Sequence, residues 1–433
     1  MAMVVKNNMS AISTLNTLNK NSSALAKSLA KVSSGMKINS AADDASGYAI
    51  SERMRVQIRS LDQDNQNTQN GQSMMKVAEG AVSSTVEILK TLKEKVINAA
   101  NDTNTDADRQ TIQKELDQSV DQINDNAAIT FNGKYLVDGS HNTSVTATTT
   151  SLTNESLWKD TKFTDQFTAL KDRNGNSLKI QKSDTVTLSY VKQGKTYTTS
   201  VKADGNSLDS LIKKTKASKD LNVGSNTSVI GKNVASDTVY TADGKQGLTI
   251  TATGTGLAHQ IAGITISVTN SEGEIQKSVN AVLDNFSETI RAQDNSNDNA
   301  IVLQTGTKAN QAIKVGLTDM RAEALGLQSS TGQTLNISTQ EYANAAINVL
   351  DTAVQKALDQ QTTIGSVESR LEYTSTNLTT ASENVQSSES TIRDADMAKE
   401  MTNYTKNNVL LQAAQSMLAQ ANQNSSAVLS LLQ

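Results

Sequence analysis

The side chains that could perform catalysis or bind a metal are few and scattered. The chain has 433 residues, no cysteine and two histidines, His141 and His259, neither of which lies in a His-Glu-x-x-His pattern. A P-loop and a Gly-x-Ser-x-Gly nucleophile motif are also absent from the sequence. Gly254-Thr255-Gly256 could suggest a phosphate loop, but a turn in a Thr-rich strand region explains it better. Asp43 and Asp44 are better explained as helix caps and subunit contacts than as an acid–base pair. We therefore expect neither an enzyme nor a cofactor.

Composition limits the class of protein. The length allows about two to four domains. Proline is absent, which permits very long helices, because each proline would cost about 3 kcal/mol inside one. Aromatic residues make up only 3% of the chain, so one large conventional core is not expected for most of it. A net charge of −4 gives no reason to expect nucleic-acid binding, and no segment is long and apolar enough to insert into a membrane.

The stretch 407–433 is the most unusual, because it contains no Asp, Glu, Lys or Arg. Its apolar residues recur at three- and four-residue steps, as on one face of a helix. Its glutamines make it too polar to span lipid. Such a helix suits a site where other copies of the chain surround it, so we interpret the stretch as a polymerisation element. A disordered tail is the alternative. The periodic residues are Val409, Leu410, Ala413, Ala414, Met417, Leu418 and Ala421.

Helical patterns dominate both ends of the chain. A heptad seam begins the chain and breaks near residues 33–35, and its positions are Ala11, Leu15, Leu18, Ser22, Leu25, Leu29, Val32 and Met36. A second helix is expected from 50 to about 100, with a seam that includes Met54, Ile58, Leu61, Met75, Val82, Val86, Leu89 and Val96. A third is expected to place inward Ile112, Leu116, Val120 and Ile123. Near the other end every seventh residue is apolar for eight repeats, at Ala343, Leu350, Ala357, Ile364, Leu371, Leu378, Val385 and Ile392.

The middle of the chain has a different pattern. From about 140 to 300 it is rich in Thr, Ser, Asn and Gly, and its period becomes two. Strands are expected at 185–191 and 196–201 around a turn at Gln193-Gly194, and again at 248–253 and 264–268. A short helix is expected at 207–214, and a hairpin at 301–317. The predicted fold is multidomain α plus β. A long antiparallel coiled-coil or helical-bundle core is built from both chain ends, with a β-rich surface insertion.

Two stretches closely resemble the terminal signatures of bacterial flagellins. Residues 34–50, SGMKINSAADDASGYAI, resemble the N-terminal signature, and residues 390–401, STIRDADMAKEM, resemble the C-terminal one. The ending is similar as well, with QANQ at 420–423 and VLSLL at 428–432. The resemblance covers about 1–139 and 301–433. The signature residues that we expect to make contacts in the core are Asp43, Asp44, Gly47, Arg393, Asp394, Asp396 and Met397.

This resemblance implies an extracellular structural protein that self-polymerises into the flagellar filament for swimming. Residues 1–42 and 393–433 would form the inner helical domain around the filament lumen, and 43–139 and 301–392 the outer helical core. The insertion, 140–300, would face solvent. The implied partners are other copies of the chain, an export chaperone of the type III apparatus that passes the chain unfolded, and the cap and hook-junction proteins. The expected polymerisation residues are Leu15, Leu18, Leu25, Leu29, Val32, Met36, Val409, Leu410, Ala414, Met417, Leu418, Val428, Leu429, Leu431 and Leu432.

The resemblance also implies a patch recognised by a host receptor, Toll-like receptor 5. Here Thr91 stands in place of the usual arginine and Lys95 in place of the usual leucine. Loss of a bidentate guanidinium and of an apolar anchor is not conservative, so weakened signalling is expected. The candidate patch consists of Leu89, Thr91, Lys93, Glu94, Lys95 and Glu115.

Two other classes of protein remain as alternatives. A hook–filament junction protein shares flagellin-like ends, although such proteins usually match the two signatures less well. Abundance discriminates between the two classes, because filament subunits are the bulk protein of sheared flagella. A membrane-inserting type III translocator would need an apolar hairpin, which the sequence lacks.

Overall fold

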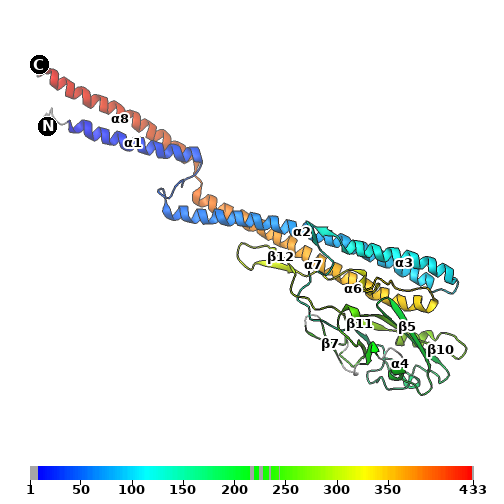
Figure 1. Cartoon of the computed structure of the whole chain (residues 1–433). Coiled ribbons are helices and arrows are strands. Elements are labelled where there is room, and N and C mark those ends of the chain that lie inside the picture. The colour runs from blue at the N-terminus through cyan, green and yellow to red at the C-terminus, as the bar shows by residue number, and fades with distance from the viewer. Residues whose placement is uncertain (1–7, 215–218, 224–227, 234–235, 243, 432–433) are drawn as a thin grey trace. The chain divides into compact units, whose positions relative to one another are not determined.

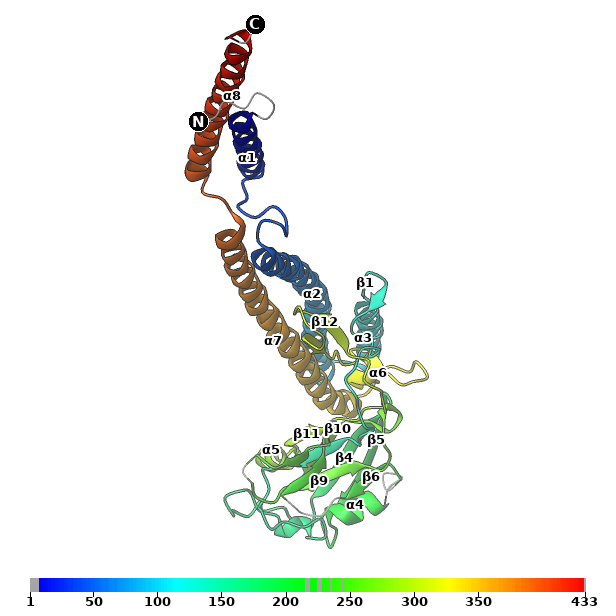
Figure 2. The same cartoon turned by 90° about the vertical axis from the view of Figure 1, so that its left-hand side faces the viewer.

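The computed structural model describes residues 8–214, 219–223, 228–233, 236–242 and 244–431. The chain divides into two compact units. The first comprises Met1–Thr68, Gln304–Gln311 and Tyr373–Gln433, and the second Gln69–Leu303 and Ala312–Glu372. Two long helices, α2 (Ala45–Ala99) and α7 (Gln340–Arg393), contribute residues to both units. Figures 1 and 2 show these elements from two directions.

The described part of the first unit is helical apart from its connections and the hairpin turn at Gln304–Gln311. It contains α1 (Met9–Ser34), α8 (Met397–Leu431), the start of α2 and the end of α7. The predicted break after the first helix is confirmed: Gly35 has the left-handed backbone (φ 71°) of a helix C-cap, and its N–H donates to Lys31 O at 3.0 Å. Among the described helices, none is both long and apolar enough to cross a lipid bilayer.

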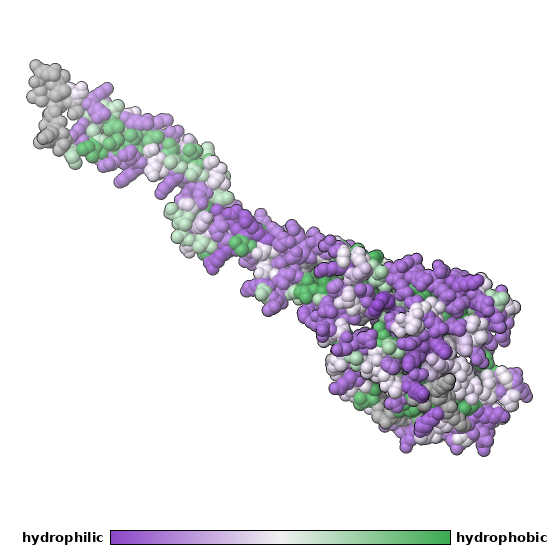
Figure 3. All heavy atoms as spheres, in the orientation of Figure 1, coloured by the Kyte–Doolittle hydropathy of each residue, from purple (hydrophilic) through white to green (hydrophobic). Residues whose placement is uncertain are grey.

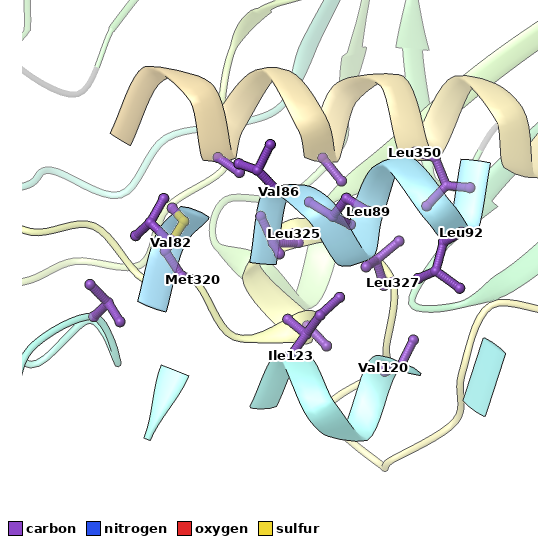
Figure 4. Packing of buried hydrophobic residues seen from close by; sticks show 14 of the residues in the cluster. Val82, Val86, Leu89, Leu92, Val120, Ile123, Met320, Leu325, Leu327 and Leu350 are labelled. Carbon is purple, nitrogen blue, oxygen red and sulfur yellow. The ribbon is translucent and has the colours of Figure 1, made fainter. Parts of the chain in front are cut away.

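The second unit has a helical core built from the later part of α2, α3 (Asp106–Ala127) and the earlier part of α7. Thr105 begins α3 with a capping box, because its side chain accepts from Asp108 N while Asp108 accepts from Thr105 N. Side chains at three- and four-residue steps on these helices meet short loops and α6 (Ala322–Leu325), as Figure 4 shows. The predicted heptads of α7 are confirmed here by the full burial of Ala343, Leu350, Ala357, Ile364 and Leu371.

The β-rich insertion contains two antiparallel sheets that share one hydrophobic core. The predicted turn at Gln193-Gly194 is confirmed, with φ of 49° and 69°, as in a type I′ hairpin. One sheet has the order β10 (Ile261–Thr269), β4 (Thr185–Lys192), β5 (Lys195–Lys202). The other has the order β11 (Phe286–Ile290), β3 (Ser151–Asn154), β9 (Leu248–Ala252), β6 (Leu221–Val223).

Smaller elements complete the described structure. The predicted hairpin is confirmed as β12 (Ile301–Gln304) with β13 (Ala312–Val315), and the predicted short helix as α4 (Leu208–Lys214). The other two-stranded sheets are β1 (Thr130–Phe131) with β2 (Lys134–Tyr135) and β7 (Val229–Lys232) with β8 (Thr238–Tyr240). The remaining short helices are α5 (Lys277–Leu283), η1 (Phe167–Ala169) and η3 (Leu257–His259).

Charged groups attach the insertion to α7 within the second unit. Lys356 of α7 lies 3.3 Å from the carboxylate of Glu288 on β11, and both side chains are almost completely buried, at 6% and 5% exposed. Arg291, just after β11, forms an ion pair with Asp359 of α7. Burial lowers the pKa of Lys356, an effect that the Glu288 carboxylate opposes. The last strand of the insertion is therefore tied to the helix through a buried ion pair.

A second attachment covers the free edge of β10. Asp284, which follows α5, accepts hydrogen bonds from Ile266 N of β10 and from Asn348 Nδ2 of α7, both at 3.1 Å. Asn280 of α5 accepts from Val268 N at 2.7 Å. These side chains occupy positions where a further strand would otherwise pair. Burial raises the pKa of Asp284 to about 6, against the lowering effect of the Asn348 and Ile266 hydrogen bonds.

This carboxyl makes the stability of the second unit depend on pH. The folded pKa of Asp284 lies above the ordinary value of 3.8, so ionising this carboxyl destabilises the folded state. The destabilisation is complete above about pH 6 and disappears as the pH falls to about 4. Asp284→Asn keeps an acceptor oxygen without the charge. We expect it to raise the free energy of unfolding by roughly 1–3 kcal/mol at pH 8 and to change it little at pH 4. Urea unfolding at both pH values measures this, and an equal effect at both would contradict it.

Candidate assembly surface

The first and last helices form an antiparallel pair, as the views in Figures 1 and 2 agree. Asn8 Nδ2 donates to Ala421 O at 3.2 Å, and Asn21 Nδ2 donates to Leu410 O at 3.1 Å. Further along, Asn407 Nδ2 donates to Ser28 Oγ at 3.1 Å. Amide side chains thus link two helices from opposite ends of the sequence.

Only half of the predicted seam of α1 faces α8. Asn21 and Ser28, which are not predicted seam positions, make polar contacts with α8, and Ser28 is only 6% exposed. Leu15 and Leu29 are 45% and 51% exposed, so they do not pack fully within the chain. Small polar residues allow the two backbones to approach, whereas Leu15 and Leu29 stay exposed. The seam residues that are partly buried are Ala11, Leu18, Leu25, Val32 and, beyond the helix, Met36.

The uncharged stretch of α8, from residue 407, divides its apolar residues in the same way. Ala414 is buried and Leu418 half-buried. Val409, Leu410 and Met417 are 59%, 42% and 63% exposed. In Figure 3 the α1–α8 pair carries a band of hydrophobic surface with hydrophilic residues beside it. The pair therefore buries one apolar face within the chain and leaves further apolar surface open.

The last predicted residues of this surface are only partly placed. Val428, Leu429 and Leu431 lie in α8, which describes their backbone but not their side chains. Leu432 lies outside the described residues. The helical pattern of the uncharged stretch is thus confirmed as far as Leu431.

Two linkers lie side by side where the terminal helices meet α2 and α7. Lys37 N donates to Arg393 O at 2.6 Å, and Ala395 N donates to Gly35 O at 2.9 Å. Met36 and Asp394 form an isolated antiparallel bridge between these bonds. The linker after α1 and the linker before α8 are therefore joined by backbone hydrogen bonds, and we call this pair the joint.

Arg393 fills the centre of the joint with its side chain. The guanidinium is buried, and its Nη1 donates to Glu52 Oε1 at 2.7 Å and to Ser51 Oγ at 3.3 Å. It also lies 5.5 Å from the ring centroid of Tyr48, within range of a cation–π contact. The hydrogen bond from Arg393 holds the pKa of Glu52 below its usual range. Sequence reasoning identified Arg393 but missed Ser51 and Glu52, which directly follow the N-terminal signature.

The acidic residues of the N-terminal signature cap the turns before α2. Asp43 accepts from Asn39 N and Ser40 N at 3.2 and 3.1 Å, bonds that hold its pKa below the ordinary value. Asp44 Oδ1 accepts from Ser46 N and Gly47 N, both at 3.1 Å, at the first turn of α2. A Cβ on Gly47 would stand 2.6 Å from Asp44 Oδ2, so a larger residue would force the capping carboxylate to shift.

The C-terminal signature has equivalent roles at the start of α8. Asp394 Oδ2 accepts from Ser390 Oγ at 2.6 Å, which closes the end of α7. Asp396 Oδ1 accepts from Lys399 N at 3.1 Å and caps α8. Met397 begins α8 and is 43% exposed. These carboxylates are occupied by backbone and hydroxyl donors, as expected of caps. Nothing in their geometry arranges them for proton transfer.

The candidate receptor patch is not one exposed surface. Leu89 is fully buried in the helical core, so its inclusion in a surface patch was wrong. Lys95 lies 3.0 Å from Glu115, and Lys93 forms an ion pair with Asp351. Glu94 and Thr91 are exposed, and the Thr91 hydroxyl donates to Glu87 O at 3.0 Å.

Comparison with known proteins identifies both ends of the chain. Residues 5–142 match the model of the bacterial flagellin N-terminal helical region, and residues 347–432 match that of the C-terminal helical region. The flagellin of Clostridium tyrobutyricum is 32% identical, over 97% of this chain and 99% of its own length. The flagellin of Bacillus subtilis is 28% identical, over 99% and 100%. The solved flagellar junction protein FlgL from Legionella pneumophila has a TM-score of 0.30 and 15% identity, covering 74% of this chain and 99% of that one.

Proposed function

Because the chain belongs to the bacterial flagellin family and is a subunit of the extracellular flagellar filament, we propose that the α1–α8 pair is the element through which it polymerises. The exposed apolar surface of this pair carries the proposal. Leu15, Leu29, Leu410 and Met417 are 42% to 63% exposed in the single chain. Burying a side chain of this kind contributes about 1.5–3 kcal/mol, so surrounding copies would stabilise the pair considerably.

Polymerisation and folding of the ends are then coupled. A pair of helices with so much apolar surface open is weakly held in a monomer, and neighbours supply the missing contacts. Hydrogen exchange provides the readout: amides of residues 9–34 and 397–431 should exchange rapidly in the monomer and become protected in filaments.

The proposed division of the filament subunit follows the breaks in the chain. Residues 1–42 and 393–433 form the inner domain, residues 43–139 and 301–392 the outer core, and residues 140–300 the solvent-facing insertion. Both joint linkers lie close to the inner boundaries. The seven strands of the two larger sheets fall between 151 and 290.

Seeded assembly tests the proposal. Purified full-length chain and a version ending at Lys406 are added separately to short filament fragments and examined by electron microscopy. We expect long filaments from the full chain only, because the truncation removes most of α8. Filaments from both would show that the polymerisation element lies elsewhere. If neither chain elongates the fragments, the junction-protein alternative is favoured. The abundance of this chain in sheared flagella is a second test, because filament subunits are the bulk protein there.

The remaining partners are proposed from the same assignment. An export chaperone would bind the ends before assembly, and the chain would pass unfolded through the type III apparatus to meet the hook-junction and cap proteins. The absence of proline removes slow isomerisation from folding after delivery. A pull-down with the truncated chain should lose the chaperone if α8 is its binding segment, whereas retained binding would place the chaperone elsewhere.

We also propose that the protein has no enzymatic role. The described part of the chain holds no group of three or more His, Asp or Glu side chains placed to bind a metal. A hollow of about 240 Å³ is lined by Arg321, Asp319 and Lys356, among others. Two of its cations are already paired, Arg321 with Asp319 at 2.6 Å and Lys356 with Glu288. An enzymatic activity that copurifies with the filament protein, in proportion to its amount, would contradict the proposal.

Receptor signalling is proposed to be weak. Thr91 offers no guanidinium, and Lys95 is paired with Glu115 instead of presenting an apolar surface. In a Toll-like receptor 5 reporter-cell assay we expect potency below that of an enteric flagellin, and Thr91→Arg with Lys95→Leu should raise it. Equal potency of the unaltered chain would refute the expectation.

A further inference from the structure

One side of α1 carries a row of lysines. Lys20, Lys27 and Lys31 are seven and four residues apart, which places them within roughly 40° of one another around a helix. Lys20 and Lys27 are exposed and Lys31 is half-buried. The row runs roughly 16 Å along the helix, or three turns. We call these three residues the lysine ridge.

The chain offers the ridge little opposite charge of its own. α1 contains no acidic residue, and α8 contains Glu400 as its single acid, with none from 407 onward. Because the pair is antiparallel, Lys20 lies beside the uncharged stretch of α8. Of the ion pairs found among the described residues, none involves the ridge. Lys31 lies close enough to Asp43 to contribute to the lowered pKa of that carboxyl.

A polymer makes this charge a problem that a monomer does not have. In water an isolated surface lysine is well solvated. Copies packed through α1 and α8 would bring many ridges together in a region with less water, where like charges repel more strongly. A stable assembly therefore needs a source of negative charge close to each ridge.

The matching charge lies on segment 383–400. It holds five carboxylates and two cations, a net charge of −3 against +3 for the ridge. Its cation Arg393 is already bound to Glu52. Glu383 is exposed and Glu389 half-buried on α7, and neither takes part in the described ion pairs. The five carboxylates are Glu383, Glu389, Asp394, Asp396 and Glu400.

We propose that the lysine ridge of one copy docks against segment 383–400 of a second copy, an inference that rests on the proposed polymerisation through α1 and α8. The apolar surface supplies most of the attraction between copies. The ridge and the acidic segment fix which surfaces meet and in what register, as charge complementarity does at other interfaces. In this arrangement the acidic residues that flank the joint act between copies as well as within one.

The experiment measures the critical concentration for elongation from wild-type filament fragments by sedimentation, with microscopy of the pellets. The ridge variant is K20E/K27E/K31E, and glutamate forms helices about as well as lysine does. Its matched control, K171E/K202E/K277E, makes the same change in net charge at exposed positions of the insertion. The rescue variant adds E383K/E389K to the ridge variant and leaves the capping carboxylates in place.

We expect the ridge variant to raise the critical concentration by about tenfold or more, because three weak ion pairs between copies are replaced by repulsion. The critical concentration of the control variant should stay within about twofold of the wild-type value. The rescue variant should bring the critical concentration most of the way back to the wild-type value. Equal values for wild type and ridge variant would overturn the inference while leaving polymerisation intact. A loss that the rescue does not reverse would overturn segment 383–400 as the partner. Failure of the wild-type chain to elongate would instead refute the proposed function.

Discussion

A chain carrying Leu410→Gln and Met417→Gln should fail to elongate filament fragments at concentrations where the wild-type chain does so readily. Leu410 and Met417 remain 42% and 63% exposed in the single chain. If the exposed part of each is buried between copies, its loss removes about 0.5–2 kcal/mol per subunit added. The critical concentration should then rise by about tenfold to a hundredfold.

The control for this prediction exchanges the two residues conservatively. Leu410→Met with Met417→Leu keeps the surface apolar and similar in volume, so it should elongate nearly as the wild type does. Sedimentation and electron microscopy measure both variants on the same seeds. Elongation of the glutamine variant at wild-type concentrations would show that this face of α8 is not buried in the filament.

Lys356→Met should strongly destabilise the second unit. It leaves the Glu288 carboxylate buried without the ammonium 3.3 Å away, and breaking a buried pair costs about 3–5 kcal/mol. Adding Glu288→Leu removes the stranded charge, so the double variant should return to within about 1 kcal/mol of the wild type or exceed it. Urea unfolding of the full chain at pH 8, followed by circular dichroism, measures all three.

An exposed pair provides the comparison. Lys213 lies 2.7 Å from Asp209 on α4, and its side chain is 69% exposed. Lys213→Met should therefore change the free energy of unfolding by less than about 1 kcal/mol. If Lys356→Met has an equally small effect, the buried pair does not hold the insertion to α7.

Much of the helical architecture could be predicted because its signal is local. The seven-residue repeat of α7 follows from its own sequence, and Ile364 and Leu371 are buried as that repeat requires. The contact face of α1 could not be predicted in the same way. Leu15 and Leu29 continue the heptad, yet Asn21 and Ser28 face α8. Which side of α1 is covered depends on α8, and no periodicity within α1 reports it.

The site shows the same division. The motif identified Arg393 and the paired aspartates, whose capping role follows from residue type and position. The bond from Arg393 to Glu52 joins residues 341 positions apart, so only the folded chain reveals it. Leu89 is a different case, since its place in the predicted seam of α2 already indicated an inward side chain. Placing it in an exposed patch as well was inconsistent with helical geometry.

The joint also sets an order in time. Arg393 Nε lies 3.3 Å from Met36 Sδ, across a separation of 357 residues. Closing so long a loop directly is entropically costly, and folding of the segments between shortens it. We therefore expect the core around α2 and α7 to form first, the joint next, and α1 with α8 last. Whichever end of the chain is delivered first cannot form the α1–α8 pair until the other end arrives. Because this pair forms last, we also expect it to open first.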